Sequence, residues 1–353
     1  MSKKNLRIGV IGAGRIGIVH SGSVNDTAGA ELVVVVDAIE ESAAKLAGQY
    51  GAKHTTNIDD IFTKGDVDAI IVGSPTPTHV DLINRSIDAG IHVLCEKPVD
   101  LDINRANTIK DKVANSKTNV SIAFNRRYDP NFAAVYARVK AGELGNLEQL
   151  VLTSRDPAPP PQSYIAVSGG IFRDQVIHDF DIARYFVGDI AEVSTFATNA
   201  FSSEIKAEGD FDTAITNLRS TDGKLVSIIN SRHSSYGYDQ RLEAFGDKGM
   251  LQVTNVAPTS VRSFKADHSE QLDPYLDFFL ERYAASYRKE LALFIESIET
   301  GKQLNPTYED GCKALILADA ATESAKTGKV VKVERFRNLR LQVRLELGVG
   351  IPH

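Results

Sequence analysis

The chain has 353 residues, of which 42% are hydrophobic and 24% charged, a composition that is ordinary for a globular protein. This length predicts two domains and a core that needs no disulfide framework, which excludes disordered chains and small secreted scaffolds. The formal net charge is -6, from 40 basic and 46 acidic residues. We therefore expect no general attraction to nucleic acids or anionic membranes.

The cysteines and the apolar segments predict a cellular compartment. Cys95 and Cys312 are too far apart in sequence for a CxxC redox pair or a zinc finger, and two thiols fit a reducing cytoplasm. The chain has no stretch of about 18 apolar residues, so we expect no transmembrane helix. The apolar run near the N-terminus is short and broken by glycines, and we interpret it as a first strand rather than a signal peptide.

Apolar runs alternate with amphipathic segments up to residue 123. The runs are 6–11, 32–36, 69–72, 92–94 and 120–123, and the helical segments between them are 15–25, 40–50, 78–89 and 102–115. Short apolar strands separated by helices are typical of a doubly wound parallel sheet. The sequence therefore predicts an α/β domain of the Rossmann type, which we place at residues 1–125.

After Tyr128 the pattern changes to that of an α+β domain, which we place at 126–334. The expected elements are helices at 129–142, 174–187, 275–300 and 307–327, a strand at 147–154, a proline-rich loop at 157–161 and short strands between 191 and 265. Turn signals separate these short alternating runs, which predicts an antiparallel sheet. A C-terminal helix could pack back on the first domain. The tail 335–353 is either an extra edge strand or an added extension.

A glycine-rich turn follows the first predicted strand and opens a helix. Its sequence is Gly12-Ala13-Gly14-Arg15-Ile16-Gly17. Gly12 permits a tight turn, Gly14 lets a pyrophosphate approach the backbone, and Gly17 lets the helix pack closely on the strand. Asp37 ends the second strand, where a carboxylate would accept hydrogen bonds from ribose hydroxyls and repel a 2′-phosphate. The pattern predicts a dinucleotide site that favours NAD over NADP.

Two further loops follow strands of the predicted parallel sheet. Ser74, Thr76 and His79 follow the run 69–72, and Glu96 and Lys97 follow the run 92–94. Ligands of open parallel sheets lie beyond the carboxyl ends of the strands, so we expect these side chains near the cofactor. The alternatives are a connection stiffened by prolines for the first loop and a solvated surface charge for Lys97.

Asp174 and His178 are four residues apart on a predicted helix and would share one face of it. A carboxylate beside an imidazole fixes its tautomer and supports its protonated form, which suits a general base. The alternatives are a surface pair, a satisfied buried histidine or a helix cap at Asp174. Asp181 could complete a metal site, but the usual zinc spacing is absent, so we predict no metal.

Three segments together carry a family resemblance. GAGRIG at 12–17, CEKP at 95–98 and GGIFRDQVIHDFDIARY at 169–185 are similar in order and spacing to the Gfo/Idh/MocA oxidoreductases, up to about residue 333. SRDPAPPPQSYI at 154–165 and YGYDQRLEAFG at 236–246 resemble the inositol 2-dehydrogenases of that family. The resemblance implies NAD as cofactor and a C-terminal domain with a large open sheet. It also implies a homotetramer built on the outer face of that sheet.

The resemblance also implies roles for particular residues. Lys97, Asp174 and His178 match the family's catalytic positions, and Pro98 matches a proline that is often cis. The positions that resemble polyol-binding residues are Arg127, Asp156, Tyr236 and Tyr283. The alternatives are a structural ion pair between Arg127 and Asp129, and tyrosines that only pack.

The activity implied by the resemblance is the NAD-dependent oxidation of an inositol ring hydroxyl to a ketone, in inositol catabolism. His178 would be the general base, Asp174 would orient it, and Lys97 would donate a hydrogen bond to the developing alkoxide. The alternatives are an NAD-dependent dehydrogenase of another sugar or polyol, an NAD-dependent glycoside hydrolase, and a non-catalytic NAD or sugar sensor.

Overall fold

The computed structural model of the chain describes residues 5–334 and divides into two compact units. One unit comprises the residues up to Ala134 together with Leu276–Leu315, and the other comprises Val135–Tyr275 together with the residues from Ile316 on. The boundary that we expected after residue 125 therefore lies inside the first unit. The tail 335–353 lies outside the described residues.

The first unit is built on a parallel sheet, which in the described residues has six strands in the order β3-β2-β1-β4-β5-β6. The strands are β1 (Leu6–Ile11), β2 (Ala30–Val36), β3 (Lys53–Thr55), β4 (Ala69–Val72), β5 (His92–Cys95) and β6 (Val120–Ile122). This doubly wound order confirms the predicted Rossmann fold. β3 was not predicted because Lys53 and His54 at this sheet edge are exposed polar residues, which give no apolar run.

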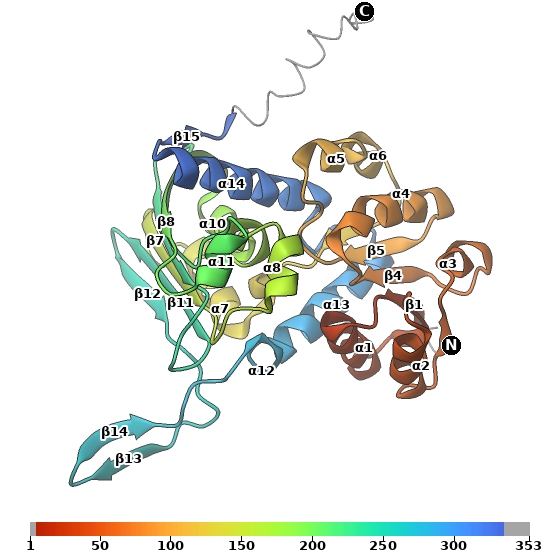
Figure 1. Cartoon of the computed structure of the whole chain (residues 1–353), viewed down its shortest axis with the longest axis horizontal. Coiled ribbons are helices and arrows are strands. Elements are labelled where there is room, and N and C mark those ends of the chain that lie inside the picture. Colours follow the sequence, from red (N-terminus) through yellow and green to blue (C-terminus); the bar gives the residue numbers. More distant parts are fainter. Residues whose placement is uncertain (1–4, 335–353) are drawn as a thin grey trace, which may run out of the picture. The chain divides into compact units, whose positions relative to one another are not determined.

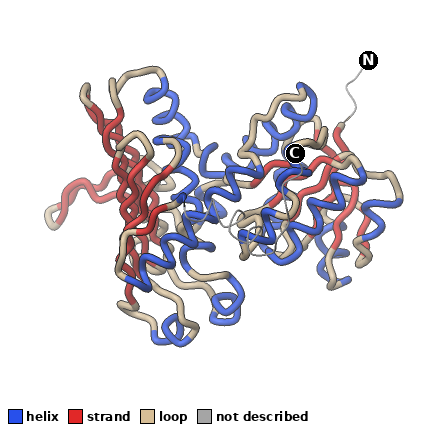
Figure 2. Tube along the Cα trace, turned by 90° about the horizontal axis from the view of Figure 1, so that it is seen from above, coloured by secondary structure: helices blue, strands red, loops and turns tan. Residues whose placement is uncertain are grey.

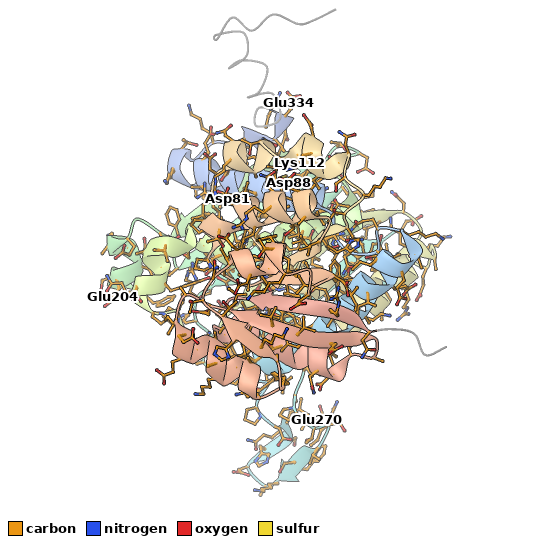
Figure 3. The ribbon with its side chains drawn as sticks, turned by 90° about the vertical axis from the view of Figure 1, so that its right-hand side faces the viewer. Asp81, Asp88, Lys112, Glu204, Glu270 and Glu334 are labelled. Carbon is orange, nitrogen blue, oxygen red and sulfur yellow. The ribbon has the colours of Figure 1, made fainter. Side chains whose placement is uncertain are left out.

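The helices between these strands are α1 (Arg15–Asp26), α2 (Glu40–Gly48), α3 (Asp59–Thr63), η1 (Thr76–Thr78), α4 (His79–Ala89), α5 (Ile103–Asn107) and α6 (Lys110–Ala114). After β6 come η2 (Asn125–Tyr128) and α7 (Pro130–Lys140). The single helix predicted at 102–115 is wrong. The hydroxyl of Thr108 donates to the carbonyl of Arg105, a local bond that competes with helical continuation. On the surface, Lys112 Nζ of α6 lies 2.6 Å from Oδ1 of Asp88, near the C-terminal end of α4 (Figure 3).

Residues late in the chain return to the first unit as α12 (Phe279–Arg282) and α13 (Ala284–Thr300). Leu291, Phe294 and Ile295 of α13 are buried in the same core cluster as Ile8 and Val10 of β1. Their spacing of three and four residues puts them on one face of the helix. A helix from the C-terminal third of the chain thus completes the core beneath the glycine-rich turn.

The second unit is built on a mixed, mostly antiparallel sheet, which in the described residues has the order β12-β11-β7-β10-β9-β8-β15. Its strands are β7 (Leu147–Arg155), β8 (Ile190–Thr198), β9 (Thr213–Ser220), β10 (Leu225–Ser231), β11 (Asp239–Gly246), β12 (Gly249–Val253) and β15 (Val331–Lys332). β10 runs parallel to β7, and the other pairs are antiparallel. The hairpin of β13 (Arg262–Lys265) and β14 (His268–Leu272) extends away from this sheet (Figure 1).

The two faces of this sheet differ. In the described residues, the helices of this unit lie on one face (Figure 2). They include α8 (Gln162–Ser168), α9 (Ile171–Asp174), α10 (Ile177–Val187), α11 (Ser203–Ala207) and the second half of α14 (Tyr308–Thr327). Ser324 Oγ of α14 accepts a hydrogen bond of 2.9 Å from the backbone N–H of Thr195 in β8. The opposite face exposes apolar side chains, among them Phe196 and Ile215, which are paired across β8 and β9.

No helix in residues 5–334 combines the length and the apolar character needed to cross a membrane.

Candidate functional site

The glycine-rich turn has the geometry that its sequence predicts. Gly12 has φ +99°, and a Cβ there would lie 2.6 Å from the carbonyl oxygen of Gly73. A Cβ on Gly17 would lie 1.9 Å from the Gly12 carbonyl oxygen, so α1 packs against the turn too closely for any side chain. Gly14 differs, because a Cβ there would meet nothing within 4 Å. The space at Gly14 is open, as a cradle for a pyrophosphate requires.

Asp37 fixes this turn to the end of β2. Its Oδ2 accepts a hydrogen bond of 2.6 Å from the backbone N–H of Ala13, and its Oδ1 accepts one of 2.8 Å from Ile39. Each oxygen keeps a lone pair for a ribose hydroxyl. Gly14 caps α1 without a side-chain hydrogen bond, so the first N–H groups of the helix are available to an anion. These residues fit the adenosine and pyrophosphate parts of NAD.

Arg15 and Ile16 begin α1 beside this cradle. The Arg15 guanidinium lies 5.9 Å from the centre of the Phe278 ring, and its side chain is exposed. Ile16 packs next to Gly73, where an added Cβ would lie 3.1 Å from Ile16 Cγ2. Both residues are therefore on the surface that borders the turn.

The loop after β4 is tied to the loop after β5 by His79. The His79 ring is 1% exposed, and its Nε2 lies 2.9 Å from the Ser74 carbonyl oxygen. Its Nδ1 lies 2.8 Å from the carbonyl oxygen of Pro98. Burial lowers the pKa of His79 below its ordinary value, despite these two carbonyl groups. The side chain thus positions both loops, while Ser74 and Thr76 are partly exposed on the first of them.

Lys97 follows β5 and precedes a cis peptide bond to Pro98, as the resemblance implies. The carboxylate of Glu96 is mostly buried and lies between His20 Nε2, at 2.8 Å, and the backbone N–H of Lys97, at 3.2 Å. His20 was not singled out from the sequence. It is 1% exposed on α1 and meets the Tyr287 ring edge-on. The Glu96 carboxylate therefore fixes the backbone of Lys97 relative to His20 of α1.

Cys95, next to this loop, is fully buried, and burial raises the pKa of its thiol well above the ordinary value. A buried thiol with a raised pKa is unreactive, so Cys95 has a packing role.

Two of the four residues expected to bind a polyol belong to the first unit. Arg127 Nη2 lies 3.5 Å from Asp310 Oδ1. Asp129, the alternative partner that we considered for Arg127, pairs with Arg282. Tyr283 is 1% exposed, and its ring lies 5.1 Å from the Arg282 guanidinium. The packing role that we considered for this tyrosine is thus present.

In the second unit, Asp174 and His178 do not share one helix, so the predicted helix at 174–187 is wrong at its start. Asp174 is the last residue of α9, and His178 is the second residue of α10. At the junction, the N–H groups of Gln175 and Val176 both donate to the Ile171 carbonyl oxygen, at 2.9 and 3.0 Å.

The side chain of Gln175 explains this break. It is buried, and its Nε2 donates to the carbonyl oxygen of Ser231, at 3.0 Å, and more weakly to that of Ser154, at 3.4 Å. These carbonyl groups belong to the carboxyl ends of β10 and β7, which run parallel. The helix junction that carries Asp174 and His178 is thereby fixed to the ends of two strands.

Asp174 accepts hydrogen bonds from two side chains that sequence reasoning missed. The hydroxyl of Tyr164 donates to Oδ1 at 2.9 Å, and Nη1 of Arg232 donates to Oδ2 at 3.1 Å. The other guanidinium nitrogen, Nη2, lies 3.2 Å from Asp210 Oδ2. Arg232 is 58 residues from Asp174 in sequence, and no local pattern marks it as a partner.

The other two expected polyol-binding residues occupy different environments. Asp156 follows β7, its N–H donates to the Ser231 carbonyl at 3.0 Å, and its charge acts on Arg232. The Tyr236 hydroxyl donates to Asp239 at 2.6 Å and accepts a bond of 2.8 Å from Arg155. The structure thus places Asp156 near the cluster of Arg232, Asp174 and Asp210, whereas the Tyr236 hydroxyl is bonded to the ends of β7 and β11.

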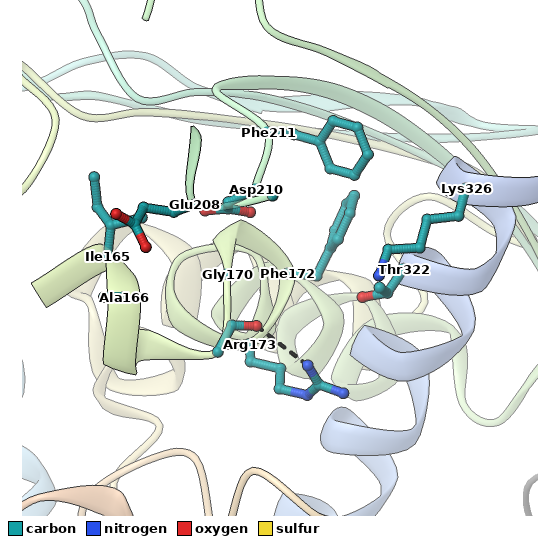
Figure 4. Close-up of a pocket in the computed structure, with 12 residues that line it drawn as sticks. Ile165, Ala166, Gly170, Phe172, Arg173, Glu208, Asp210, Phe211, Thr322 and Lys326 are labelled. Atoms are coloured by element: carbon teal, nitrogen blue, oxygen red, sulfur yellow. Dashed lines mark hydrogen bonds between the residues drawn. The ribbon is translucent and has the colours of Figure 1, made fainter. Parts of the chain in front are cut away.

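A pocket of about 180 Å³ lies beside this cluster in the second unit (Figure 4). It is lined by Ile165, Ala166, Gly169, Gly170, Phe172, Arg173, Glu208, Gly209, Asp210, Phe211, Thr322 and Lys326. None of these is a residue that the sequence analysis assigned to the site, so the pocket and the predicted chemistry do not coincide. Asp181 is buried, and residues 5–334 contain no group of three His, Cys, Asp or Glu side chains placed to hold a metal ion.

Comparison with known proteins agrees with this arrangement. Residues 6–124 match the model of an oxidoreductase family with an NAD-binding Rossmann fold, and residues 132–252 match the Gfo/Idh/MocA C-terminal domain. The chain is 42% identical to an inositol 2-dehydrogenase of Rhizobium meliloti over 93% of this chain and 99% of that protein.

Solved structures give the same result. A myo-inositol dehydrogenase from Corynebacterium glutamicum is 52% identical, with a TM-score of 0.90 over 93% of this chain and 98% of that one. A scyllo-inositol dehydrogenase from Lactobacillus casei with bound NAD(H) and scyllo-inositol is 26% identical, with a TM-score of 0.87 over 94% of this chain and 100% of that one. The predicted resemblance is confirmed: the chain belongs to the Gfo/Idh/MocA oxidoreductase family, and its first unit is an NAD-binding Rossmann domain.

Proposed function

We propose that this chain oxidises a ring hydroxyl of an inositol to a ketone, with NAD as the oxidant. The observation that carries the proposal is the fixed carboxylate of Asp174, held by Arg232 and Tyr164 directly before the helix that bears His178. The support from relatives is the 42% identity to an inositol 2-dehydrogenase that is covered almost completely. A sensor of NAD or of a sugar would not need a carboxylate held in this way.

In the proposed reaction, neutral His178 removes the proton of the substrate hydroxyl. Asp174 orients the imidazole and stabilises its protonated form, a task for which its carboxylate must itself be held in place. Lys97 donates a hydrogen bond to the hydroxyl oxygen as negative charge develops there. The glycine-rich turn and Asp37 would hold NAD, which would supply the hydride acceptor for the carbon that carries this oxygen.

The first unit supports this chemistry by holding Lys97 from two sides. His20 and Glu96 fix the backbone N–H of Lys97, and His79 fixes the carbonyl of Pro98. Both supporting histidines are 1% exposed, so neither competes for the substrate proton. The amine of Lys97 can therefore be placed by a rigid backbone rather than by a mobile loop.

A polyol is uncharged and carries many hydroxyl groups, so it is recognised by several polar side chains rather than by an anion clamp. We include Asp156 and Arg127 in the proposed substrate site because both are partly buried charged groups, Asp156 directly after β7 and Arg127 in η2 after β6. Tyr236 and Tyr283 also stay in the proposal. Their roles are less direct, because Tyr283 is buried and the Tyr236 hydroxyl is bonded to Arg155 and Asp239.

We also propose that the protein works in the cytoplasm as a homotetramer. The support is the outer face of the sheet, where exposed apolar side chains lie on β8, β9 and β10 and, beyond β7, on β11 and β12. They are Phe196, Ile215, Leu225, Phe245 and Met250. Exposed apolar surface of this extent marks a protein interface. Light scattering after size exclusion should give four chains for the wild type and fewer for Phe196→Asp.

Deuterium transfer tests the proposed reaction. With myo-inositol deuterated at its ring carbons, the reduced cofactor should carry one deuterium and the organic product should be an inosose. If deuterated glucose gave this result and no inositol did, the activity would be that of a sugar dehydrogenase. Release of a sugar from a glycoside without net NADH would instead indicate a hydrolase.

A further inference from the structure

Arg232 is the first residue after β10, and its side chain has no exposed surface. A guanidinium in this position is stable only if carboxylates surround it, and two of them do, from Asp174 and Asp210. Burial by itself would lower the pKa of Arg232. The charges of Asp174 and Asp210 outweigh this effect, so its pKa is raised and the group stays charged.

The two carboxylates hold opposite ends of the same short helix. Asp210 Oδ1 accepts a hydrogen bond of 2.9 Å from the N–H of Ile171, the first residue of α9. Asp174 is the last residue of α9. The planar guanidinium of Arg232 bonds to each carboxylate through a different nitrogen. It therefore links the two ends of the single helical turn that ends at Asp174.

The backbone before α9 is shaped to admit this arrangement. Gly170 has φ +86°, and a Cβ there would lie 2.9 Å from Asp210 Oδ1. A side chain at this position would displace the carboxylate that the guanidinium needs. Figure 4 shows Asp210 beside Gly170 at the edge of the pocket.

We propose that Arg232 is a positioning residue for the dehydrogenase reaction: it fixes the carboxylate of Asp174 so that this group can orient His178. The inference rests on the proposed function. It assigns no contact between Arg232 and the substrate, and its effect passes through Asp174. Tyr164 holds the other oxygen of the same carboxylate but is 46% exposed, so the buried guanidinium is the main constraint.

The first test is Arg232→Lys, which keeps the charge but replaces the fork by a single ammonium group that cannot hold both carboxylates. We expect kcat to fall about 10²-fold, the effect of misplacing a reacting group by roughly 1 Å, and KM to change by less than about threefold. Arg184→Lys is the matched control. Arg184 is also largely buried and pairs with Asp189 in the same unit, and this variant should keep wild-type kcat.

The second test separates positioning from general stability. If Arg232 acts through Asp174, then Arg232→Lys should reduce kcat no further in a chain that already carries Asp174→Asn. Wild-type kcat in Arg232→Lys would overturn the proposal. So would a double variant in which the losses of the two single variants multiply.

Two further measurements keep the inference testable if a variant misfolds or if the wild type does not turn over inositol. Should Arg232→Lys not fold, Asp210→Asn loosens the same fork, and unchanged kcat in that variant would overturn the proposal. A crystal structure of Arg232→Lys reports on Asp174 whatever the substrate is. A carboxylate displaced by about 1 Å or more supports positioning even if the proposed reaction fails, whereas an unmoved carboxylate contradicts it.

Discussion

Gly17 lies so close to Gly12 that a Cβ on Gly17 would stand 1.9 Å from the Gly12 carbonyl oxygen. The start of α1 therefore packs directly against the turn that leaves β1, with no room for a side chain between them. The open space at Gly14 depends on this contact, because the turn and the helix together set the direction of the first free N–H groups.

Gly17→Ala should therefore lower both stability and NAD affinity. The added methyl group has no room, and overpacking of this kind costs about 1–3 kcal/mol. Gly14→Ala should reduce NAD affinity while leaving the melting temperature unchanged, because its Cβ meets nothing within 4 Å. Calorimetric titration and thermal unfolding measure the two quantities. Gly22→Ala, in the interior of the same helix, is the control. It should leave NAD affinity unchanged and raise the melting temperature slightly, because alanine is more stable than glycine in a helix interior. Equal melting temperatures for Gly17→Ala and Gly22→Ala would contradict the packing argument.

Asp37→Asn should weaken the preference for NAD over NADP. The amide oxygen can still accept a backbone hydrogen bond, but the charge that repels a 2′-phosphate is gone. We expect the ratio of kcat/KM with NADP to kcat/KM with NAD to rise by about tenfold or more, which corresponds to roughly 1.4 kcal/mol. Asp26→Asn removes an exposed carboxylate from α1 and is the matched charge control. An unchanged ratio in Asp37→Asn would show that other groups select the cofactor.

His178→Gln should lower kcat by at least about 10²-fold, the contribution typical of a positioned general base, and leave NAD affinity unchanged. His233→Gln provides the comparison, since His233 is an exposed histidine of the same unit that stacks on Phe201. Steady-state rates with the preferred polyol measure both variants. Near-normal turnover in His178→Gln would remove this residue from the mechanism.

His79 makes stability depend on pH. Because burial lowers its pKa below 6.5, the unfolded chain binds a proton more readily than the folded chain. Its contribution is complete above the unfolded pKa and is lost as the pH falls below about 6.5. The melting temperature of the wild type should fall between about pH 7.5 and about pH 5.5, and in His79→Gln this fall should be smaller by roughly 2–4 °C. Part of the fall should remain, because burial also lowers the pKa of His92.

The control for this comparison is His54→Gln, which removes a half-exposed histidine from β3. Its pH dependence should match that of the wild type. If His79→Gln also kept the full wild-type dependence, the buried ring would not be the titrating group.

The Rossmann fold, and where it places the residues expected to bind the cofactor, could be predicted because their determinants are local in sequence. The glycine turn, Asp37 and the loops after β4 and β5 each lie directly after a strand, and the order of a parallel sheet brings such loops to one edge. The edge strand β3 could not be recognised from an apolar run, because Lys53 and His54 are polar and exposed.

The support of Asp174 could not be predicted in the same way. The helical spacing of the sequence predicted one helix. Two helices form instead, because Gln175 lies between them and bonds to the ends of two distant strands. Arg232 and His20 act through partners 58 and 76 residues away, and their pairing depends on the fold rather than on spacing. Residues that hold the predicted catalytic groups are therefore visible only in three dimensions.

NADH absorbance tests the proposed oxidation of an inositol most directly. The purified chain is mixed with NAD and one substrate at a time, either myo-inositol, scyllo-inositol or glucose. We expect NADH formation with an inositol, little or none with glucose, and a much lower rate when NADP replaces NAD. NAD binding without NADH formation from any inositol would contradict the proposed oxidation.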